Sequence, residues 1–293
     1  MQLALLLLKF SSPRTGEALS LIMIGMQLAF ITGCSSLFFY PQKAHQDNQH
    51  LRQVTYEDVY FQTPDHLTLH AWYLKARRGE KGTILFLHGN AENISTHINN
   101  VLWLTDCGYN IFSFDYRGYG KSEGHPTIKG VHTDAQAAIE TILSLTQKDD
   151  ERIIILGQSL GGAIAVYATA NSSHKNRIKA LITDSAFSDY KVIAREKLAL
   201  FTITRLFQYP LASLFADEHS PIKWMKRVAP VPVLILHGDK DTIIPPHHSL
   251  MLYNEALPPK DFWLVKDAGH VQAFVSKEIR ERFLEYLQSI PSR

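Results

Sequence analysis

The feature that most constrains the fold is a series of short apolar runs that alternate with helical patterns. Each run has only four or five residues, and most are followed by a stretch with helical periodicity. Short, continuous apolar strands separated by helices are typical of a buried parallel sheet with helices on both faces. The predicted strands are Thr83–Leu87, Asn110–Phe114, Ile153–Leu156, Ala180–Thr183, Val233–Leu236 and Phe262–Val265.

Two alternating runs come before this series. Val54–Phe61 and Leu67–Leu74 are separated by the turn residues Pro64-Asp65, which predicts an antiparallel hairpin. Helical patterns cover about 94–106, 131–147, 160–171, 247–257 and 275–289. No internal repeat or low-complexity linker is visible, so we expect one α/β domain over residues 54–293.

One strand of the series leads directly into a nucleophile motif. Ile153–Leu156 is followed by Gly157-Gln158-Ser159-Leu160-Gly161, and small, helix-forming residues come next. A sharp strand-to-helix turn holds a serine hydroxyl where an acyl carbon can reach it, and the flanking glycines allow the turn. Ser159 is therefore the predicted nucleophile.

A second match to the same pattern lies in a different context. Gly120-Lys121-Ser122-Glu123-Gly124 follows a polar, turn-like segment and precedes His125-Pro126. Because proline interrupts a helical pattern, Ser122 is expected in a loop and not at a nucleophile turn.

Composition excludes several other classes of protein. The net charge of +2 does not favour nucleic acid as a partner. The 14 histidines form no H-E-x-x-H or Cys/His cluster, and His247-His248 alone is interpreted as a solvated pair. Gly118-Tyr119-Gly120 lacks the third glycine of a dinucleotide loop, and no phosphate-binding G-x-x-x-x-G-K-[ST] occurs. Neither a cofactor nor a metal is therefore expected.

The partners of Ser159 should follow the ends of strands, because sites in open α/β sheets lie beyond the carboxyl ends of the strands. His270 follows the last strand and fits the chain order Ser…Asp…His. Asp241 is favoured as the acid over Asp239, which is expected to cap a turn, and over Asp184. His88 and His237 also lie at strand ends, where we expect them to hydrogen-bond locally and shape loops.

The oxyanion of an acyl-transfer reaction needs two backbone N–H donors. One is expected from Leu160, the residue after the nucleophile, and the other from the loop His88-Gly89-Asn90. Asn90 is the preferred second donor, with Ala91 as the alternative.

An apolar segment between the fourth and fifth strands of the parallel series, after the sixth strand overall, exceeds the length of one helix. It lies between Asp184 and Val231 and includes Leu198, Leu200, Phe201, Ile203, Leu206, Phe207, Leu211, Leu214 and Phe215. One interpretation is an ordinary core helix. The other is a small cap over about 186–228 that covers the nucleophile and lines an acyl pocket.

Five motifs in this order resemble the α/β-hydrolase superfamily. The similarity runs from about residue 54 to the end, and its nearest branch is that of membrane-anchored hydrolases related to serine aminopeptidase and bud-emergence-type proteins, which includes protein depalmitoylases. The resemblance implies a triad of Ser159, Asp241 and His270. Many relatives have Gly-Asn where this chain has Glu92-Asn93. The motifs are His88-Gly89-Asn90-Ala91-Glu92-Asn93, Asp115-Tyr116-Arg117-Gly118-Tyr119-Gly120-Lys121-Ser122, Gly157-Gln158-Ser159-Leu160-Gly161-Gly162, His237-Gly238-x-x-Asp241 and Gly269-His270.

The N-terminal residues 1–33 have the pattern of a secretory signal peptide. Lys9 and Arg14 precede the apolar stretch Ala18–Ile31, and small residues come directly before Cys34. This arrangement resembles a bacterial lipobox, in which the cysteine is lipidated and becomes the new N-terminus. Ser35 resembles the next residue of lipoproteins that diderm bacteria sort to the outer membrane, so in such a host we expect the protein to face the periplasm or cell surface.

Other interpretations of this region stay open. Ala18 to Tyr40 is 23 residues, near the length of a single membrane-spanning anchor. A disulfide between Cys34 and Cys107 would exclude lipidation, whereas Cys107 is otherwise expected to be a small buried hydrophobe. The polar stretch from Gln42 to Gln53 predicts a tether over 34–53.

The sequence therefore predicts a membrane-attached serine esterase or thioesterase. Its substrate is expected to be a small acyl compound or an acylated protein. The alternative is an amidase or aminopeptidase with the same triad, and a more distant one is a non-catalytic binding protein on a hydrolase scaffold.

Overall fold

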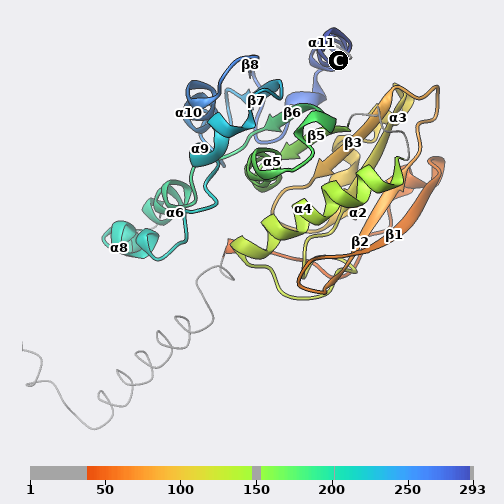
Figure 1. The fold of residues 1–293 in the computed structure, drawn as a ribbon. Coiled ribbons are helices and arrows are strands. Elements are labelled where there is room, and N and C mark those ends of the chain that lie inside the picture. The colour runs from red at the N-terminus through yellow and green to blue at the C-terminus, as the bar shows by residue number, and fades with distance from the viewer. Residues whose placement is uncertain (1–37, 147–152, 201, 291–293) are drawn as a thin grey trace, which may run out of the picture. The chain divides into compact units, whose positions relative to one another are not determined.

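The computed structural model describes residues 38–146, 153–200 and 202–290, which are built around one eight-stranded sheet (Figure 1). The predicted signal peptide, Cys34 and the beginning of the predicted tether lie outside the described residues. Within the described ranges, no helix has the length and apolar character needed to cross a membrane.

The sheet has the order β1-β2-β4-β3-β5-β6-β7-β8. The first two strands form the predicted antiparallel hairpin, β2 is also antiparallel to β4, and the remaining pairs are parallel. This confirms the predicted α/β class and every predicted strand. The strands are β1 (Tyr56–Gln62), β2 (Thr68–Leu74), β3 (Gly82–Leu87), β4 (Tyr109–Phe114), β5 (Ile153–Gln158), β6 (Ile178–Asp184), β7 (Val233–Gly238) and β8 (Lys260–Val265).

Helices cover both faces of the sheet. On one face, α2 (Ile94–His97), α3 (Trp103–Asp106) and α11 (Lys277–Ser289) share a buried apolar cluster with alternate strand residues such as Ile84 and Ile154. On the other face, α4 (Ile128–Leu145) and α5 (Leu160–Asn171) lie in front of the sheet in Figure 1. Because the central strands are buried on both faces, their sequences are continuous apolar runs.

Several predicted helices differ in their bounds. The helix expected over 94–106 is divided into α2, η4 (Ile98–Asn100) and α3, and Val101, between η4 and α3, leaves helical geometry. By contrast, α4 begins three residues before the predicted 131, since the Thr127 side chain accepts a hydrogen bond from the backbone N–H of Gly130 and caps the first turn. The helix expected over 247–257 is α10 (His247–Glu255).

The long apolar segment forms a small helical cap and not a single core helix. It is inserted between β6 and β7, and its first helices lie at the left of Figure 1. Its helices are α6 (Tyr190–Ala199), α7 (Thr202–Arg205), α8 (Gln208–Ser213), α9 (Pro221–Trp224) and η6 (Met225–Val228).

Residues 39–54, called here the N-terminal segment, are bound to the domain, so the prediction of a tether over 34–53 is wrong for these residues. The carbonyl of Gln42 accepts hydrogen bonds from the backbone of Gly120 (2.9 Å) and the side chain of Asn93 (3.0 Å). Phe39 and Leu51 are buried. Most of these contacts use polar groups, and a hydropathy pattern does not distinguish a polar segment that docks from one that is solvated.

Candidate active site

Ser159 occupies the sharp turn between β5 and α5. Its φ of +55° lies in the left-handed region, which a non-glycine residue adopts only when its surroundings enforce it. A Cβ on Gly157 would lie 2.3 Å from the carbonyl oxygen of Gly161, and one on Gly161 would lie 2.0 Å from that of Leu87. The two glycines of the motif therefore allow the strand, the turn and the helix to pack this closely.

The structure brings Ser159, His270 and Asp241 together. His270 Nδ1 lies 2.7 Å from Asp241 Oδ2, and His270 Nε2 lies 3.0 Å from Ser159 Oγ. Because a carboxylate only accepts hydrogen bonds, Nδ1 carries the proton of the neutral ring and Nε2 has a lone pair for the serine hydroxyl. This is the tautomer that a general base requires.

Asp241 is fixed on both of its oxygens. Oδ1 accepts from the backbone N–H groups of Ile243 and Ile244, each at 2.9 Å, and Oδ2 also lies 3.2 Å from His237 Nε2. Burial alone would raise the pKa of Asp241, but hydrogen bonds from His237, His270 and Ile244 together hold that pKa well below its ordinary value. The carboxylate is therefore ionised at neutral pH.

The two other candidate acids lie elsewhere. Asp239 is exposed, and its backbone N–H donates to the Val265 carbonyl at 3.0 Å. Asp184 is fully buried; its carbonyl accepts the Ser159 N–H (2.9 Å), and its carboxylate accepts from Gln158 Nε2 (3.0 Å). Burial raises the pKa of Asp184 to about 6, against the opposing effect of its hydrogen bonds. Asp184 supports the nucleophile turn from inside the domain.

The predicted oxyanion donors lie on two segments that approach each other at Ser159. Leu160 is the first residue of α5, where a backbone N–H has no partner within the helix. The loop after β3 passes beside the nucleophile, because a Cβ on Gly89 would lie 3.7 Å from Ser159 Cβ. Asn90 Oδ1 accepts from Tyr119 Oη (2.8 Å) and the Tyr40 backbone (3.1 Å), which fixes the side chain of this loop residue.

The Glu92-Asn93 difference from many relatives is compatible with the same loop shape. Glu92 has a φ of +61°, in the region that favours glycine, so the backbone keeps a conformation that glycine adopts easily. Asn93 is buried and caps α2 by accepting from the Ser95 backbone at 3.0 Å. Its amide also donates to the N-terminal segment.

The structure also shows the positions of residues for which the sequence predicts no catalytic role. Ser122 lies in a loop, where its hydroxyl donates to the Asp115 carbonyl (2.6 Å) and accepts from the His70 backbone (2.9 Å). His88 is buried and donates to the Gly89 carbonyl (2.7 Å), and burial lowers its pKa to about 3. Cys107 is partly buried, which raises the pKa of its thiol.

Sequence reasoning missed part of the environment of the site. His237 does more than shape its loop, because it contacts the acid directly; its Nε2 donates to the Ile244 carbonyl (2.8 Å) and Nδ1 lies 2.6 Å from Ser249 Oγ. Ser185 Oγ accepts the backbone N–H of Val271, next to His270, at 3.1 Å. His237 is the next-to-last residue of β7 and Ser185 directly follows β6, so a position at the carboxyl end of a strand is the sequence signal for both residues.

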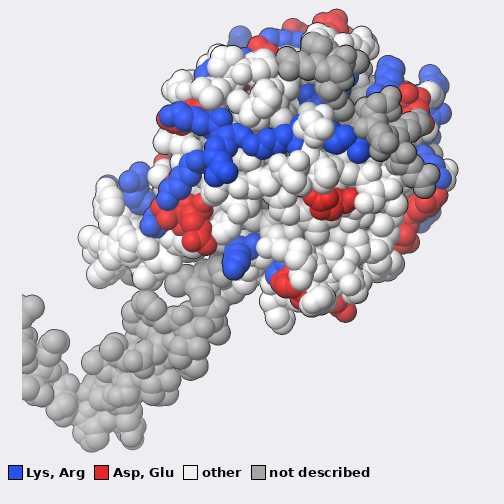
Figure 2. Space-filling model, in the orientation of Figure 1, with Lys and Arg blue, Asp and Glu red and all other residues white. Residues whose placement is uncertain are grey.

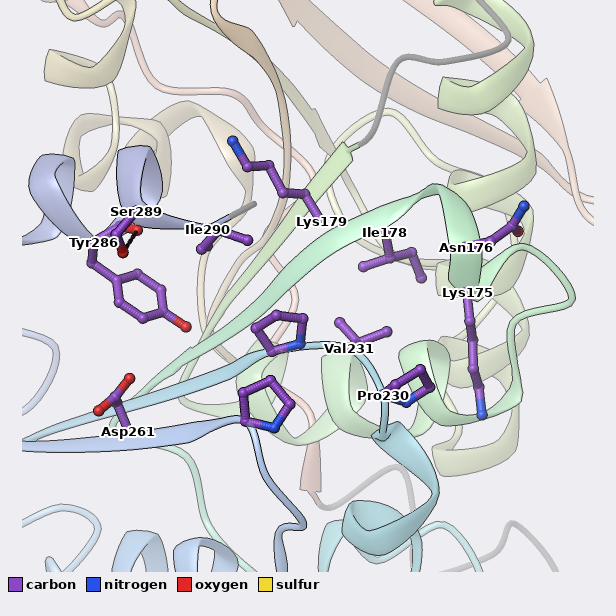
Figure 3. A pocket seen from close by; sticks show the side chains of 12 residues that line it. Lys175, Asn176, Ile178, Lys179, Pro230, Val231, Asp261, Tyr286, Ser289 and Ile290 are labelled. Atoms are coloured by element: carbon purple, nitrogen blue, oxygen red, sulfur yellow. Dashed lines mark hydrogen bonds between the residues drawn. The ribbon is translucent and has the colours of Figure 1, made fainter. Parts of the chain in front are cut away.

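A separate surface pocket of 670 Å³ lies at the opposite edge of the sheet (Figure 3). Its lining residues include Ile178, Val231 and Asp261, which lie within two residues of the first residues of β6, β7 and β8. The catalytic candidates instead follow the carboxyl ends of their strands. The pocket in Figure 3 is thus not part of the Ser159 site.

Comparisons with known proteins agree with this geometry. Residues 82–217 match the family model described as alpha/beta hydrolase fold. The protein YfhR of Escherichia coli O157:H7 is 34% identical over 241 residues, 80% of this chain and 81% of YfhR. The alpha/beta hydrolase domain-containing protein WAV2 of Arabidopsis thaliana is 37% identical over 209 residues, 69% of this chain and 67% of WAV2.

Solved structures extend the likeness to most of the chain. An esterase of Pyrococcus furiosus has a TM-score of 0.70 at 21% identity, covering 85% of this chain and 97% of the esterase. Acetyl xylan esterase 1 of Thermoanaerobacterium has a TM-score of 0.62 at 19% identity, covering 85% and 87%. With its sheet order, its strand-to-helix serine turn and these relatives, the chain belongs to the α/β-hydrolase family.

Proposed function

We propose that this protein is a serine hydrolase that cleaves carboxylic esters or thioesters through an acyl-enzyme on Ser159. The observation that carries the proposal is the line of hydrogen bonds from Asp241 through His270 to Ser159, with contacts of 2.7 and 3.0 Å. A histidine between a carboxylate and a serine hydroxyl is the arrangement of a nucleophile with its general base.

In the proposed reaction, Ser159 Oγ attacks the acyl carbon while His270 Nε2 takes the hydroxyl proton. The tetrahedral intermediate carries its negative charge on the former carbonyl oxygen, which accepts hydrogen bonds from the backbone N–H groups of Leu160 and Asn90. The bond to the leaving group then breaks, and His270 returns the proton to the departing alcohol or thiol. In the second half, water attacks the acyl carbon while His270 Nε2 takes one of its protons. The bond from the acyl carbon to Ser159 Oγ then breaks, His270 returns the proton to Ser159 Oγ, and the acid is released.

The cap is the proposed contact for the acyl group. Several of its apolar side chains are exposed, and the area over α8 is largely uncharged in Figure 2. The cap also reaches the acid loop, because Lys197 of α6 donates to the carbonyl of Ile243, two residues after Asp241. A long acyl chain would remove these side chains from water, at about 25 cal/mol for each Å² buried. They are Leu200, Leu206, Phe207, Tyr209 and Leu214.

A substrate panel on the full chain tests the proposal. It contains p-nitrophenyl esters of increasing acyl length, acyl thioesters and aminoacyl anilides, with Ser159→Ala as the matched control. We expect turnover of esters or thioesters, none in Ser159→Ala, and covalent labelling of Ser159 by a fluorophosphonate. Turnover restricted to aminoacyl anilides would instead establish the amidase alternative. A folded protein without labelling or turnover would favour a non-catalytic binding protein.

We further propose that Cys34 is lipidated and holds the enzyme at a membrane, facing the periplasm or cell surface. The proposal rests on the small residues before Cys34 and the apolar stretch before them. In a diderm bacterial host, the mature N-terminus should be a diacylated Cys34, and Cys34→Ser should abolish lipid labelling. An intact N-terminus in the membrane fraction would establish the single-span anchor instead.

A further inference from the structure

A second cluster of histidines and a carboxylate lies where the N-terminal segment meets the sheet. Asp115 follows β4 directly and is fully buried. Its Oδ2 lies 2.8 Å from Nε2 of His45, in the N-terminal segment, and 3.5 Å from Nδ1 of His70, in β2. The three atoms all lie within 4.8 Å of one another. They therefore converge on one small volume.

The hydrogen bonds of His70 leave an unsatisfied nitrogen facing this volume. Nε2 of His70 contacts Asp58 Oδ1 at 2.5 Å, and Trp72 Nε1 donates to the same oxygen at 3.2 Å. Because the carboxylate only accepts, Nε2 carries the proton, and in the neutral ring Nδ1 presents a lone pair toward Asp115. The fully buried Nδ1 has no hydrogen-bond partner within the described residues. A cation between Nδ1 and the carboxylate would remove this conflict.

The surroundings of the cluster match those of metal ligands. A histidine that binds a metal usually donates its other ring N–H to a carboxylate, as His70 does to Asp58, and a ligating carboxylate is itself hydrogen-bonded. Asp115 Oδ1 accepts from the Ile94 backbone at 2.9 Å, which leaves Oδ2 for the cluster. A Cβ on Gly120 would lie 1.8 Å from Asp115 Oδ2 and 2.6 Å from His45 Nε2, so glycine keeps this side of the cluster open.

We propose that His45, His70 and Asp115 bind a zinc ion. Two imidazole nitrogens and one carboxylate oxygen suit zinc, whereas magnesium and calcium prefer oxygen ligands alone. Tetrahedral zinc with bonds of about 2.0–2.1 Å separates its ligand atoms by about 3.3 Å. The observed 2.8 and 3.5 Å lie on either side of that separation, so small side-chain shifts suffice. Water would complete the coordination.

The site would connect three parts of the chain that are distant in sequence. His45 lies in the N-terminal segment, His70 in β2 and Asp115 after β4. Metal binding at ligands brought together only by folding adds its binding free energy to the stability of the fold. The ion would therefore hold the N-terminal segment against the sheet. This role is independent of the proposed chemistry at Ser159.

A different histidine cluster, around Glu196, is a poorer candidate and supplies a control. The Nε2 atoms of His247 and His248 each lie 3.1 Å from a Glu196 oxygen, but His248 Nδ1 already accepts from the Ser188 backbone at 3.2 Å. The His247 side chain is half exposed. Both ring nitrogens of His248 have hydrogen-bond partners without a metal.

The test measures zinc content and thermal unfolding of the full chain after chelation and titration with zinc chloride. We expect about one equivalent of tightly bound zinc. We also expect Tm to rise by roughly 5–10 °C when free zinc exceeds the Kd by about a hundredfold. Magnesium at the same concentration should leave Tm unchanged. Absence of both zinc binding and a zinc-dependent Tm shift in the parent chain would overturn the proposal.

Three variants assign the site. His45→Gln retains an amide N–H that can donate to Asp115, so the fold is preserved while a zinc ligand is lost; both bound zinc and the Tm shift should disappear. His50→Gln changes an exposed histidine of the same segment, and His247→Gln changes the other cluster. Both should bind zinc like the parent chain. Unchanged zinc binding in His45→Gln would place the metal elsewhere and refute the assignment.

Discussion

Two carboxylates in this molecule are each held between two histidines. Asp241 contacts His270 at 2.7 Å and His237 at 3.2 Å. Asp115 contacts His45 at 2.8 Å and His70 at 3.5 Å. In both clusters the second carboxylate oxygen accepts backbone N–H groups. By residue type and contact distance, the two clusters are nearly the same.

The clusters differ in the group that contacts Nε2 of one histidine, the ring nitrogen that points away from the shared carboxylate. Nε2 of His270 faces the hydroxyl of Ser159, whereas Nε2 of His70 faces the carboxylate of Asp58. A neutral histidine between a carboxylate and a hydroxyl can accept the hydroxyl proton, but one between two carboxylates has no neutral donor to deprotonate. The third partner, and not the His–Asp contact, therefore distinguishes a proposed catalytic base from a proposed metal ligand.

The largest contrast is expected from removing one histidine of each cluster. His270→Ala removes the base and should lower kcat by on the order of 10⁶ with little change in Tm. His70→Ala removes a buried imidazole that contacts both Asp58 and Asp115 and should lower the free energy of unfolding by about 3 kcal/mol. Ester turnover and urea unfolding measure the two effects. The comparison fails if His70→Ala abolishes turnover in a protein of unchanged stability.

The next effect concerns the tautomer of His270. Asp241→Asn preserves the side-chain shape, but its amide N–H can favour the ring form with the proton on Nε2, which cannot accept the proton of Ser159. We expect kcat to fall by about 10⁴, with a much smaller change in KM. Steady-state kinetics on a p-nitrophenyl ester check this. An effect confined to KM would show that Asp241 acts on substrate binding and would remove the parallel with a catalytic triad.

The proposed catalytic cluster could be predicted from the sequence because its members follow buried strands. Parallel strands place their carboxyl ends at one edge of the sheet, so Ser159, Asp241 and His270 were expected to meet there. The preference for Asp241 over Asp239 agrees with the structure, in which Asp239 is exposed. The contact of His237 with the same carboxylate was not expected, because sequence position alone does not give the direction of a side chain.

The Asp115 cluster could not be predicted in the same way. His45 belongs to a polar segment that the sequence analysis interpreted as a tether, and its docking depends on polar contacts such as Asn93 to Gln42. His70 and Asp115 lie on strands β2 and β4, which are neighbours only in the folded sheet. Metal motifs are recognised by short, regular spacings, and these three residues have none.

A third buried carboxylate, Asp184, extends the comparison, and its substitution has the smallest expected effect. Asp184 accepts hydrogen bonds from Gln158 and Ser185, which are neutral donors. Histidine contacts hold the pKa of Asp241 and Asp115 below the ordinary value, whereas burial raises the pKa of Asp184 to about 6. The hydrogen bonds from these neutral donors thus offset the burial of Asp184 only in part.

The sign of this shift gives a prediction for stability against pH. Folded Asp184 holds its proton up to about pH 6, whereas the unfolded chain releases it near pH 4. Its contribution to stability is therefore complete below pH 4 and is lost as pH rises through 6, by up to about 3 kcal/mol. Asp184→Asn, which cannot ionise, should become more stable relative to the parent across that window. Urea unfolding at pH 4.5 and 7.5 measures the difference in unfolding free energy between the two proteins, in which the contributions of the other carboxylates cancel. A difference that is the same at both pH values would show that Asp184 is ionised at both.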